Sequence, residues 1–379
     1  MNVVEEIAGR RWANVTAIGI GLGCSWLVMF YGVPVPKTWL FTLESLVFWL
    51  LVAAALLMAC APVLRRLFPT MHQAGVSLTH LPVFGHWRGL VSPDALGLVG
   101  ALILFALPVS SLWFTGKTTY FHVGGLLPWA DPTAYYFGGR YLLNEGHLDG
   151  WNMRRPLNAG FFAARLWLVN QDLQLALVLQ AWIAAGACFL AAREVARSHG
   201  TASGVLLFAL LYEFARPYLG MPLSESLGLS FGCLGFALLW AAGRDERPWS
   251  LVALGMMFLT LGLNARAGAF FVLPAILLWT LWAFRRGGSF GWRQAGWGLA
   301  GLCAGFFLNY VLIGVLGSNT NMLHSNFAYV LYGLTLGGKS WSQIYVDHPE
   351  VKAMLDQHGE RVVAQYIYGL AFQEFLNDP

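Results

Sequence analysis

The chain has 379 residues, of which 57% are hydrophobic, 15% are aromatic and only 11% are charged, and its formal net charge is +4. A mean hydropathy of +0.58 excludes an ordinary soluble globular domain, in which about a quarter of the residues carry a charge. The sequence contains no basic run with interleaved aromatic residues, so nucleic acid is not expected as a partner.

Long apolar segments dominate the chain. A helix of roughly 20 mostly apolar residues can cross a bilayer, and about nine segments approach this length. They cover residues 15–33, 39–63, 93–115, 173–192, 203–220, 223–243, 249–263, 268–284 and 296–316. The first segment lacks a small-residue cleavage pattern, so it is expected to remain as a membrane span. The sequence therefore predicts an all-α polytopic membrane protein with about nine transmembrane helices.

Arginine pairs at the segment ends predict the orientation. These pairs are Arg10 and Arg11, Arg65 and Arg66, and Arg285 and Arg286. The positive-inside rule then places the N-terminus in the cytoplasm. The expected regions are two spans with a cytoplasmic loop in 1–92, a transmembrane core in 93–316 with an outer loop at 117–171, and an outer tail in 317–379.

The outer loop combines aromatic residues with Asp131 and a basic cluster of Arg140, Arg154, Arg155 and Arg165. Its pattern predicts two helices, over 132–145 and 156–169, joined by a glycine-rich link. The second is too short to cross a bilayer, and it is expected to lie in the outer interface.

Asp131 has two interpretations. An aspartate before Pro132 is typical of a helix N-cap with proline at the first helical position. The same carboxylate, placed near the membrane surface, could instead act as a general base for an acceptor hydroxyl.

Arg154 and Arg155 also leave two alternatives open. Adjacent guanidinium groups at a helix start suit a phosphate or pyrophosphate. They equally suit the headgroups of membrane lipids.

Four further ionisable residues lie within or beside the apolar segments, toward the expected outer face. Glu213 and Arg216 are spaced to form a pair, Glu225 opens a helix, and Arg266 lies between two segments. Charges at such positions are functional candidates because burying them is costly. Glu44 is expected to be an interface residue.

The sequence does not predict disulfides, a metal site, or the motifs of nucleotide-binding proteins and hydrolases. All five cysteines fall in apolar segments, where they are expected to be small buried residues without disulfides. No histidine pair has metal-ligand spacing, so no metal site is predicted and a divalent cofactor has no clear ligand set. No nucleotide-binding or hydrolase motif occurs.

Four stretches resemble the GT-C superfamily of membrane glycosyltransferases. They are WADPTAYYFGGRYLLNEG from 129, GWNMRRPLNAGFFAARLWL from 150, PLSESLGLSFGCLGFALLW from 222 and NARAGAFFVLPAILLW from 264. The similar branch uses polyprenyl- or dolichyl-phosphate sugars and includes protein mannosyltransferases and lipid A aminoarabinose transferases. The resemblance covers about 93–320. Family members often have two adjacent acids where Asp131 precedes Pro132, and they carry a further C-terminal domain, which is consistent with truncation here.

The resemblance implies transfer of a sugar from a lipid-phosphate-linked donor to a glycan, lipid or protein acceptor, on the extracytoplasmic face of a bacterial inner membrane. It implies the following site residues. Asp131 would be the base, Arg154, Arg155 and Arg266 would bind the donor phosphate, Arg140, Glu213, Arg216 and Glu225 would support them, and Trp129, Tyr135 and Trp151 would stack on the sugar.

Two other functions remain open at the level of sequence. One is a lipid-linked saccharide flippase or secondary transporter, although no repeat between the halves favours it. The other is a membrane assembly subunit without chemistry of its own.

Overall fold

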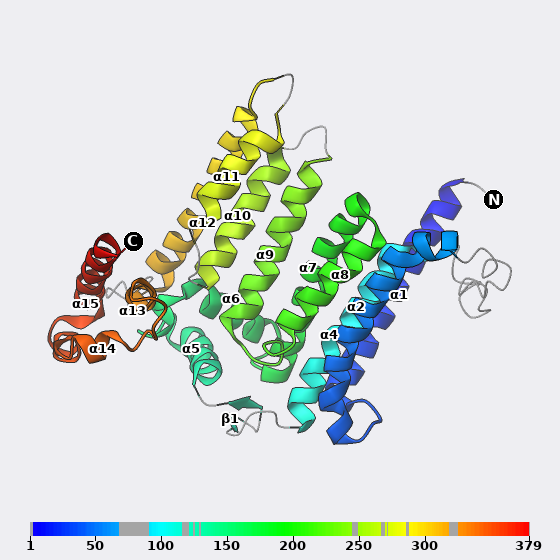
Figure 1. Ribbon diagram of the computed structural model, residues 1–379. Helices are drawn as coiled ribbons and strands as arrows, with labels where there is room; N and C mark the ends of the chain where they lie inside the picture. The colour runs from blue at the N-terminus through cyan, green and yellow to red at the C-terminus, as the bar shows by residue number, and fades with distance from the viewer. Residues whose placement is uncertain are drawn as a thin grey trace.

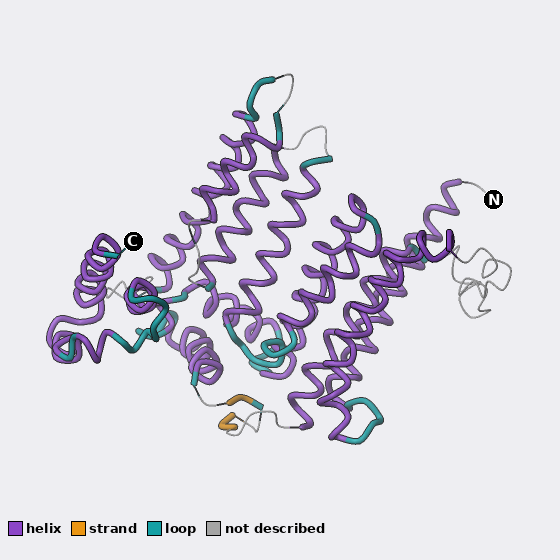
Figure 2. Tube along the Cα trace, viewed as in Figure 1, coloured by secondary structure: helices purple, strands orange, loops and turns teal. Residues whose placement is uncertain are grey.

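The computed structural model describes residues 3–67, 91–115, 121–123, 126–128, 130–244, 249–266, 270, 272–285, 288–317 and 325–378. These residues form an almost entirely helical chain (Figures 1 and 2). One small antiparallel pair joins β1 (Phe121–Val123) to β2 (Leu127–Pro128). The all-α prediction is confirmed.

Six helices among the described residues are long and apolar enough to cross a membrane, which indicates an integral membrane protein. They are α1 (Val3–Tyr31), α2 (Lys37–Leu67), α4 (Pro93–Thr115), α7 (Leu173–His199), α9 (Ser224–Ala242) and α12 (Trp292–Leu316). The other three predicted spans form shorter apolar helices, α8 (Thr201–Ala215), α10 (Trp249–Ala265) and α11 (Val272–Ala283). A series of turns ends α8 before residue 220, α11 begins four residues later than predicted, and α10 covers its predicted range.

Close helix contacts depend on small residues. A Cβ added to Gly235 of α9 would lie 2.7 Å from the carbonyl oxygen of Gly255 in α10, so a larger residue has no room there. Gly262 of α10 and Gly228 of α9 make the same kind of approach to each other about two turns away. Small residues bring backbones together where hydrophobic driving force between helices is weak. As a result α9, α10, α11 and α12 lie side by side (Figure 1).

The cysteines divide into two groups. Cys188 of α7 and Cys233 of α9 are buried, with their sulfur atoms 3.9 Å apart. Cys24, Cys60 and Cys303 are exposed on the outside of the bundle, so the prediction that all five are buried is wrong. In an apolar bundle both the inner and the outer helix faces are apolar, and composition alone does not separate them.

The loop between α4 and α7 contains the two predicted helices. They are α5 (Asp131–Glu145) and α6 (Pro156–Leu168), with the short 3-10 turn η3 (Asn152–Arg154) between them. Proline occupies the first turn of both helices, where its missing N–H leaves no bond unmade. This prediction is confirmed to within two residues.

The C-terminal region folds around a small core of its own. It consists of α13 (Ser325–Thr335), α14 (Ile344–Asp347) and α15 (Glu350–Asn377), which bury Tyr332, Ile344, Val351, Val363 and Ile367. Gly359 interrupts α15 with a φ of 76°, a conformation that glycine adopts readily. These helices lie beside the end of α12 and the α5 loop, away from the N-terminus (Figure 1).

An ionic cluster joins α7 to its neighbours at the opposite end of the bundle. Glu194 is buried, with 5% of its side chain exposed, and it pairs with Arg193 at 2.9 Å, Arg197 at 3.3 Å and Arg244. Asp94 of α4 pairs with Arg197 at 2.6 Å, but 46% of its side chain is exposed.

We expect Glu194→Ala to lower the free energy of unfolding by on the order of 3 kcal/mol, because it leaves the arginines without their buried counter-charge. Asp94→Ala is the matched control, and it should cost about 1 kcal/mol or less, since exposed pairs contribute little. Thermal unfolding of the purified chain in detergent measures both. Equal losses in the two variants would contradict the prediction.

Candidate functional site

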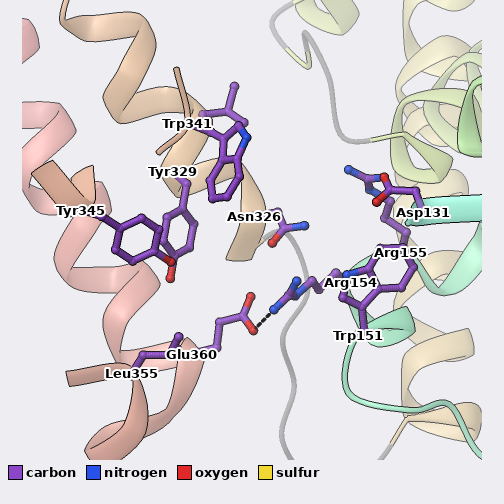
Figure 3. Close-up of a pocket in the computed structure, with 11 residues that line it drawn as sticks. Asp131, Trp151, Arg154, Arg155, Asn326, Tyr329, Trp341, Tyr345, Leu355 and Glu360 are labelled. Carbon is purple, nitrogen blue, oxygen red and sulfur yellow. Dashed lines mark hydrogen bonds and ion pairs between the residues drawn. The ribbon is translucent and has the colours of Figure 1, made fainter. Parts of the chain in front are cut away.

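A polar cavity lies where the α5 loop meets the C-terminal helices (Figure 3). Its volume is about 510 Å³, within the range of small-molecule sites. One wall carries residues of the loop, and the other carries residues of α13 to α15. The lining residues are Asp131, Trp151, Arg154, Arg155, Asn326, Tyr329, Val330, Trp341, Tyr345, Leu355 and Glu360.

Asp131 lines this cavity as the first residue of α5 and does not cap the helix. The N-cap position belongs to Ala130, and no side chain caps the helix there. Ala130 has φ 94° and ψ −142°, a conformation that only glycine adopts without strain. The capping interpretation is therefore wrong, and the strained start leaves the Asp131 carboxylate exposed to the cavity.

A side-chain lock holds η3 against α5. Asp149 Oδ1 accepts hydrogen bonds from the backbone N–H groups of Trp151 and Asn152, both at 2.9 Å. Asn152 donates from Nδ2 to Asp149 Oδ2 at 2.7 Å and to the Ala134 carbonyl oxygen at 3.2 Å. Gly138 makes room for this amide, because any Cβ there would overlap it. These bonds hold Arg154 and Arg155, two and three residues beyond Asn152, at the cavity with Asp131.

Arg155 connects the cavity to α9. Its Nη1 donates to the Tyr135 hydroxyl oxygen at 2.7 Å and approaches Ser224 Oγ at 3.5 Å. Burial alone lowers the pKa of Arg155, but Tyr135, Asp131 and Glu225 outweigh it, so the net shift of the pKa is upward. Burial raises the pKa of Tyr135, although Arg155 opposes the shift. At neutral pH, Arg155 is therefore a fixed cation and Tyr135 a neutral phenol.

Arg154 points the other way and forms an ion pair with Glu360 of α15 (Figure 3). Only 5% of the Glu360 side chain is exposed, and Ser325 Oγ donates to its Oε1 at 2.5 Å. The pair joins the two walls of the cavity. It also means that the two adjacent arginines, which the sequence groups together, have different partners.

A second cavity of about 550 Å³ opens between α8, α9, α10 and α11. Its lining is almost wholly aliphatic and aromatic, apart from Glu225 and Arg266, which form an ion pair. Ser224 Oγ donates to Glu225 Oε2 at 3.2 Å. Arg266 thus lines the second cavity rather than the first, and a polar chain through Ser224 and Glu225 links it to Arg155.

The remaining predicted residues lie in different places. Trp151 lines the polar cavity, where its ring meets Tyr135 edge-on with centroids 4.8 Å apart. Tyr135 is fully buried, so its ring is covered by protein and offers no face to a sugar. Trp129 lies outside the described residues. Arg140 is exposed on α5, with its guanidinium 5.8 Å from the Tyr136 ring centroid.

Two of the supporting candidates belong to a separate cluster. Glu213 and Arg216 form the predicted pair at 2.7 Å, at the end of α8. Arg216 also lies 3.6 Å from Glu44, whose side chain is 1% exposed and therefore faces the protein interior.

Arg165 is buried in α6 over the Phe162 ring, and burial lowers its pKa to about 10.

The sequence interpretation missed the entire C-terminal wall. Asn326, Tyr329, Trp341, Tyr345 and Glu360 were assigned no role, although together they form half of the cavity lining. The aromatic-rich stretch between 327 and 345 was a signal for Tyr329, Trp341 and Tyr345, and no local pattern marked Asn326 or Glu360. Among the described residues, no group of three or more His, Cys, Asp or Glu side chains gathers as a metal site.

We expect Gly138→Ala to destabilise the protein, because its Cβ displaces the Asn152 amide and the lock that positions η3. Overpacking of this kind costs about 1–3 kcal/mol. The matched control is Gly160→Ala in α6, where the nearest atom would lie 3.8 Å away. That change should stabilise by up to about 1 kcal/mol, since alanine is the better helix former. Thermal unfolding of both variants measures the two changes in stability. If Gly138→Ala were stabilised as well as Gly160→Ala, the prediction would be contradicted.

Comparison of the chain with known proteins returns no similar protein: no protein-family model, no curated protein and no solved structure matches it.

Proposed function

We propose that the chain is an integral membrane glycosyltransferase, which moves a sugar from a lipid-phosphate-linked donor to an acceptor at the membrane surface. One observation carries the proposal. A polar cavity with Asp131 and two arginines adjoins an apolar cavity, and the chain Arg155–Ser224–Glu225–Arg266 links them. In a lipid-phosphate-linked donor, the hydrocarbon chain would occupy the apolar cavity, the phosphate would lie near the arginines, and the sugar would occupy the polar cavity. The short motifs that resemble GT-C enzymes include residues of both cavities.

In the proposed reaction, an acceptor hydroxyl attacks the sugar's anomeric carbon while the bond from that carbon to the phosphate oxygen breaks. Asp131 takes the hydroxyl proton, and the lipid phosphate leaves with the bonding electron pair. A general base must reach the proton that it removes, and the strained start of α5 directs Asp131 into the cavity.

The leaving phosphate gains negative charge, which fixed cations in a partly dry site stabilise. Arg155 is suited to this task because it stays charged and is held by Tyr135. Arg266 would meet the phosphate from the apolar side, where the cavity between α8 and α11 accepts the lipid chain. Arg154 is already bound to Glu360, so a role with phosphate would require that carboxylate to leave.

The proposal includes nine spans, with α8, α10 and α11 crossing the membrane beside the six longer helices. By helical rise, the 17 residues of α10 extend about 26 Å, close to the hydrocarbon thickness. The α11 helix is shorter, at 12 residues, and it lies against α12. The arginine distribution supports an N-terminus in the cytoplasm, with both cavities toward the outer face.

We expect Asp131→Asn to lower the rate of donor consumption by about 10²–10⁴-fold, because the amide cannot accept the proton. The measurement is release of polyprenyl phosphate from a polyprenyl-phosphate-linked hexose by the purified chain in nanodiscs. Glu145→Gln is the control, since it removes an exposed carboxylate at the other end of the same helix. Full turnover by Asp131→Asn would refute its role as base.

Arg155→Gln should lower kcat by about 10²–10³-fold, since one stabilising donor to the leaving group is lost. Arg361→Gln is the matched control, because this exposed arginine follows Glu360 yet does not line the cavity. The same turnover assay measures both. The wild-type chain could instead move a fluorescent lipid-linked sugar across the vesicle membrane without releasing lipid phosphate. That result would favour a flippase over the proposed glycosyltransferase.

A further inference from the structure

The cavity wall opposite Asp131 is a cluster of three aromatic side chains from the C-terminal helices: Tyr329, Trp341 and Tyr345 (Figure 3). The Trp341 and Tyr345 ring centroids are 6.3 Å apart at 86°, and the Tyr329 and Tyr345 centroids are 5.8 Å apart at 35°. Tyr329 lies between the other two and is buried, with 6% of its surface exposed (Figure 3). The rings thus form a supported layer rather than three independent contacts.

Trp341 is the exposed member of this layer. Its side chain is 58% exposed although it borders a cavity, so packing into the core does not account for it. The small C-terminal core is complete without this indole, because the residues buried there come from the helices. An aromatic face left open beside hydrogen-bonding groups is available to a ligand.

A well-defined turn holds Trp341 at this position. Gly337 and Gly338 have φ values of 79° and 83°, which glycine adopts without strain. Lys339 donates its backbone N–H to the Gly333 carbonyl oxygen at 2.7 Å, and Ser342 donates its N–H to Ser340 Oγ at 3.3 Å. The indole therefore does not depend on its own burial for placement, and its removal should leave the fold intact.

The chemistry of the cavity narrows the class of ligand. Aromatic rings on one wall, with Asn326 beside them and Asp131 on the facing wall as hydrogen-bonding groups, match a ring with apolar faces and a polar edge. A sugar ring has this form. A lipid chain would instead match the aliphatic cavity between α8 and α11. The Arg154–Glu360 pair holds the aromatic layer at a set separation from Asp131.

We propose that Trp341 and Tyr345 form the acceptor subsite and that the acceptor is a saccharide. Its ring lies on the Trp341 indole, so that one hydroxyl faces Asp131 across the cavity. The assignment to the acceptor rests on the proposed function, whereas binding of a saccharide to this aromatic layer does not.

The test is saturation-transfer NMR on the full chain in nanodiscs, with maltotriose, mannotriose, galactotriose and chitotriose as probes. At least one probe should bind, and Trp341→Ala should weaken its affinity about 10-fold or more, as loss of an aromatic contact predicts. Trp341→Phe keeps an aromatic face and should bind within about threefold of wild type. Trp292→Ala is the control, because this tryptophan is 69% exposed at the start of α12.

The outcomes separate this inference from the proposed function. If no probe binds in a way that depends on Trp341, the saccharide subsite is refuted, even if Asp131-dependent turnover of a lipid-linked donor is seen. If a probe binds through Trp341 but no lipid-linked donor is consumed, the subsite stands and the transferase fails. Both proposals hold if Asp131→Asn keeps probe binding and loses turnover, while Trp341→Ala loses binding and raises the acceptor KM.

Discussion

The cost of burying charge in an apolar bundle governs how this chain is arranged. A lone buried charge is strongly destabilising, so the described ionisable groups near the helices occur mainly in pairs and clusters. Each cluster joins two or more elements at defined residues, whereas apolar contacts alone would not fix their relative positions. The clusters are Glu194 with three arginines, Arg216 with Glu213 and Glu44, Arg266 with Glu225, and Arg154 with Glu360. The last two pairs line the two cavities, so each cavity has an ion pair in its wall.

The polar cavity is a composite of two units with different origins. One unit is the loop between α4 and α7, in which the Asp149–Asn152 lock fixes Arg154 and Arg155. The other is the C-terminal unit, with a hydrophobic core of its own. The Arg154–Glu360 ion pair joins the two units, so it contributes to the width of the cavity. A site of this kind holds its geometry without a continuous core beneath it.

The sequence predicted what depends on local pattern. Apolar length identified the helices, and proline with its neighbours located the starts of α5 and α6 to within two residues. Asp131 and the two arginines were grouped correctly because they lie close in the chain. Arg266 was placed with them but lines the neighbouring cavity, and Trp341 and Glu360 were missed, because pairing across the fold leaves no local signal. Apolar composition likewise did not distinguish inner from outer faces, as the exposed Cys24 shows.

The contact between Arg154 and Glu360 joins residues 206 positions apart in the chain. During synthesis the loop with Asp131 emerges long before the helices that complete the cavity. The bundle helices that separate them are made before the second wall, and contacts so distant in sequence are costly to close early. The polar cavity therefore forms only after α15 has been made, and until then the acidic and basic residues lie in a loop without a completed pocket.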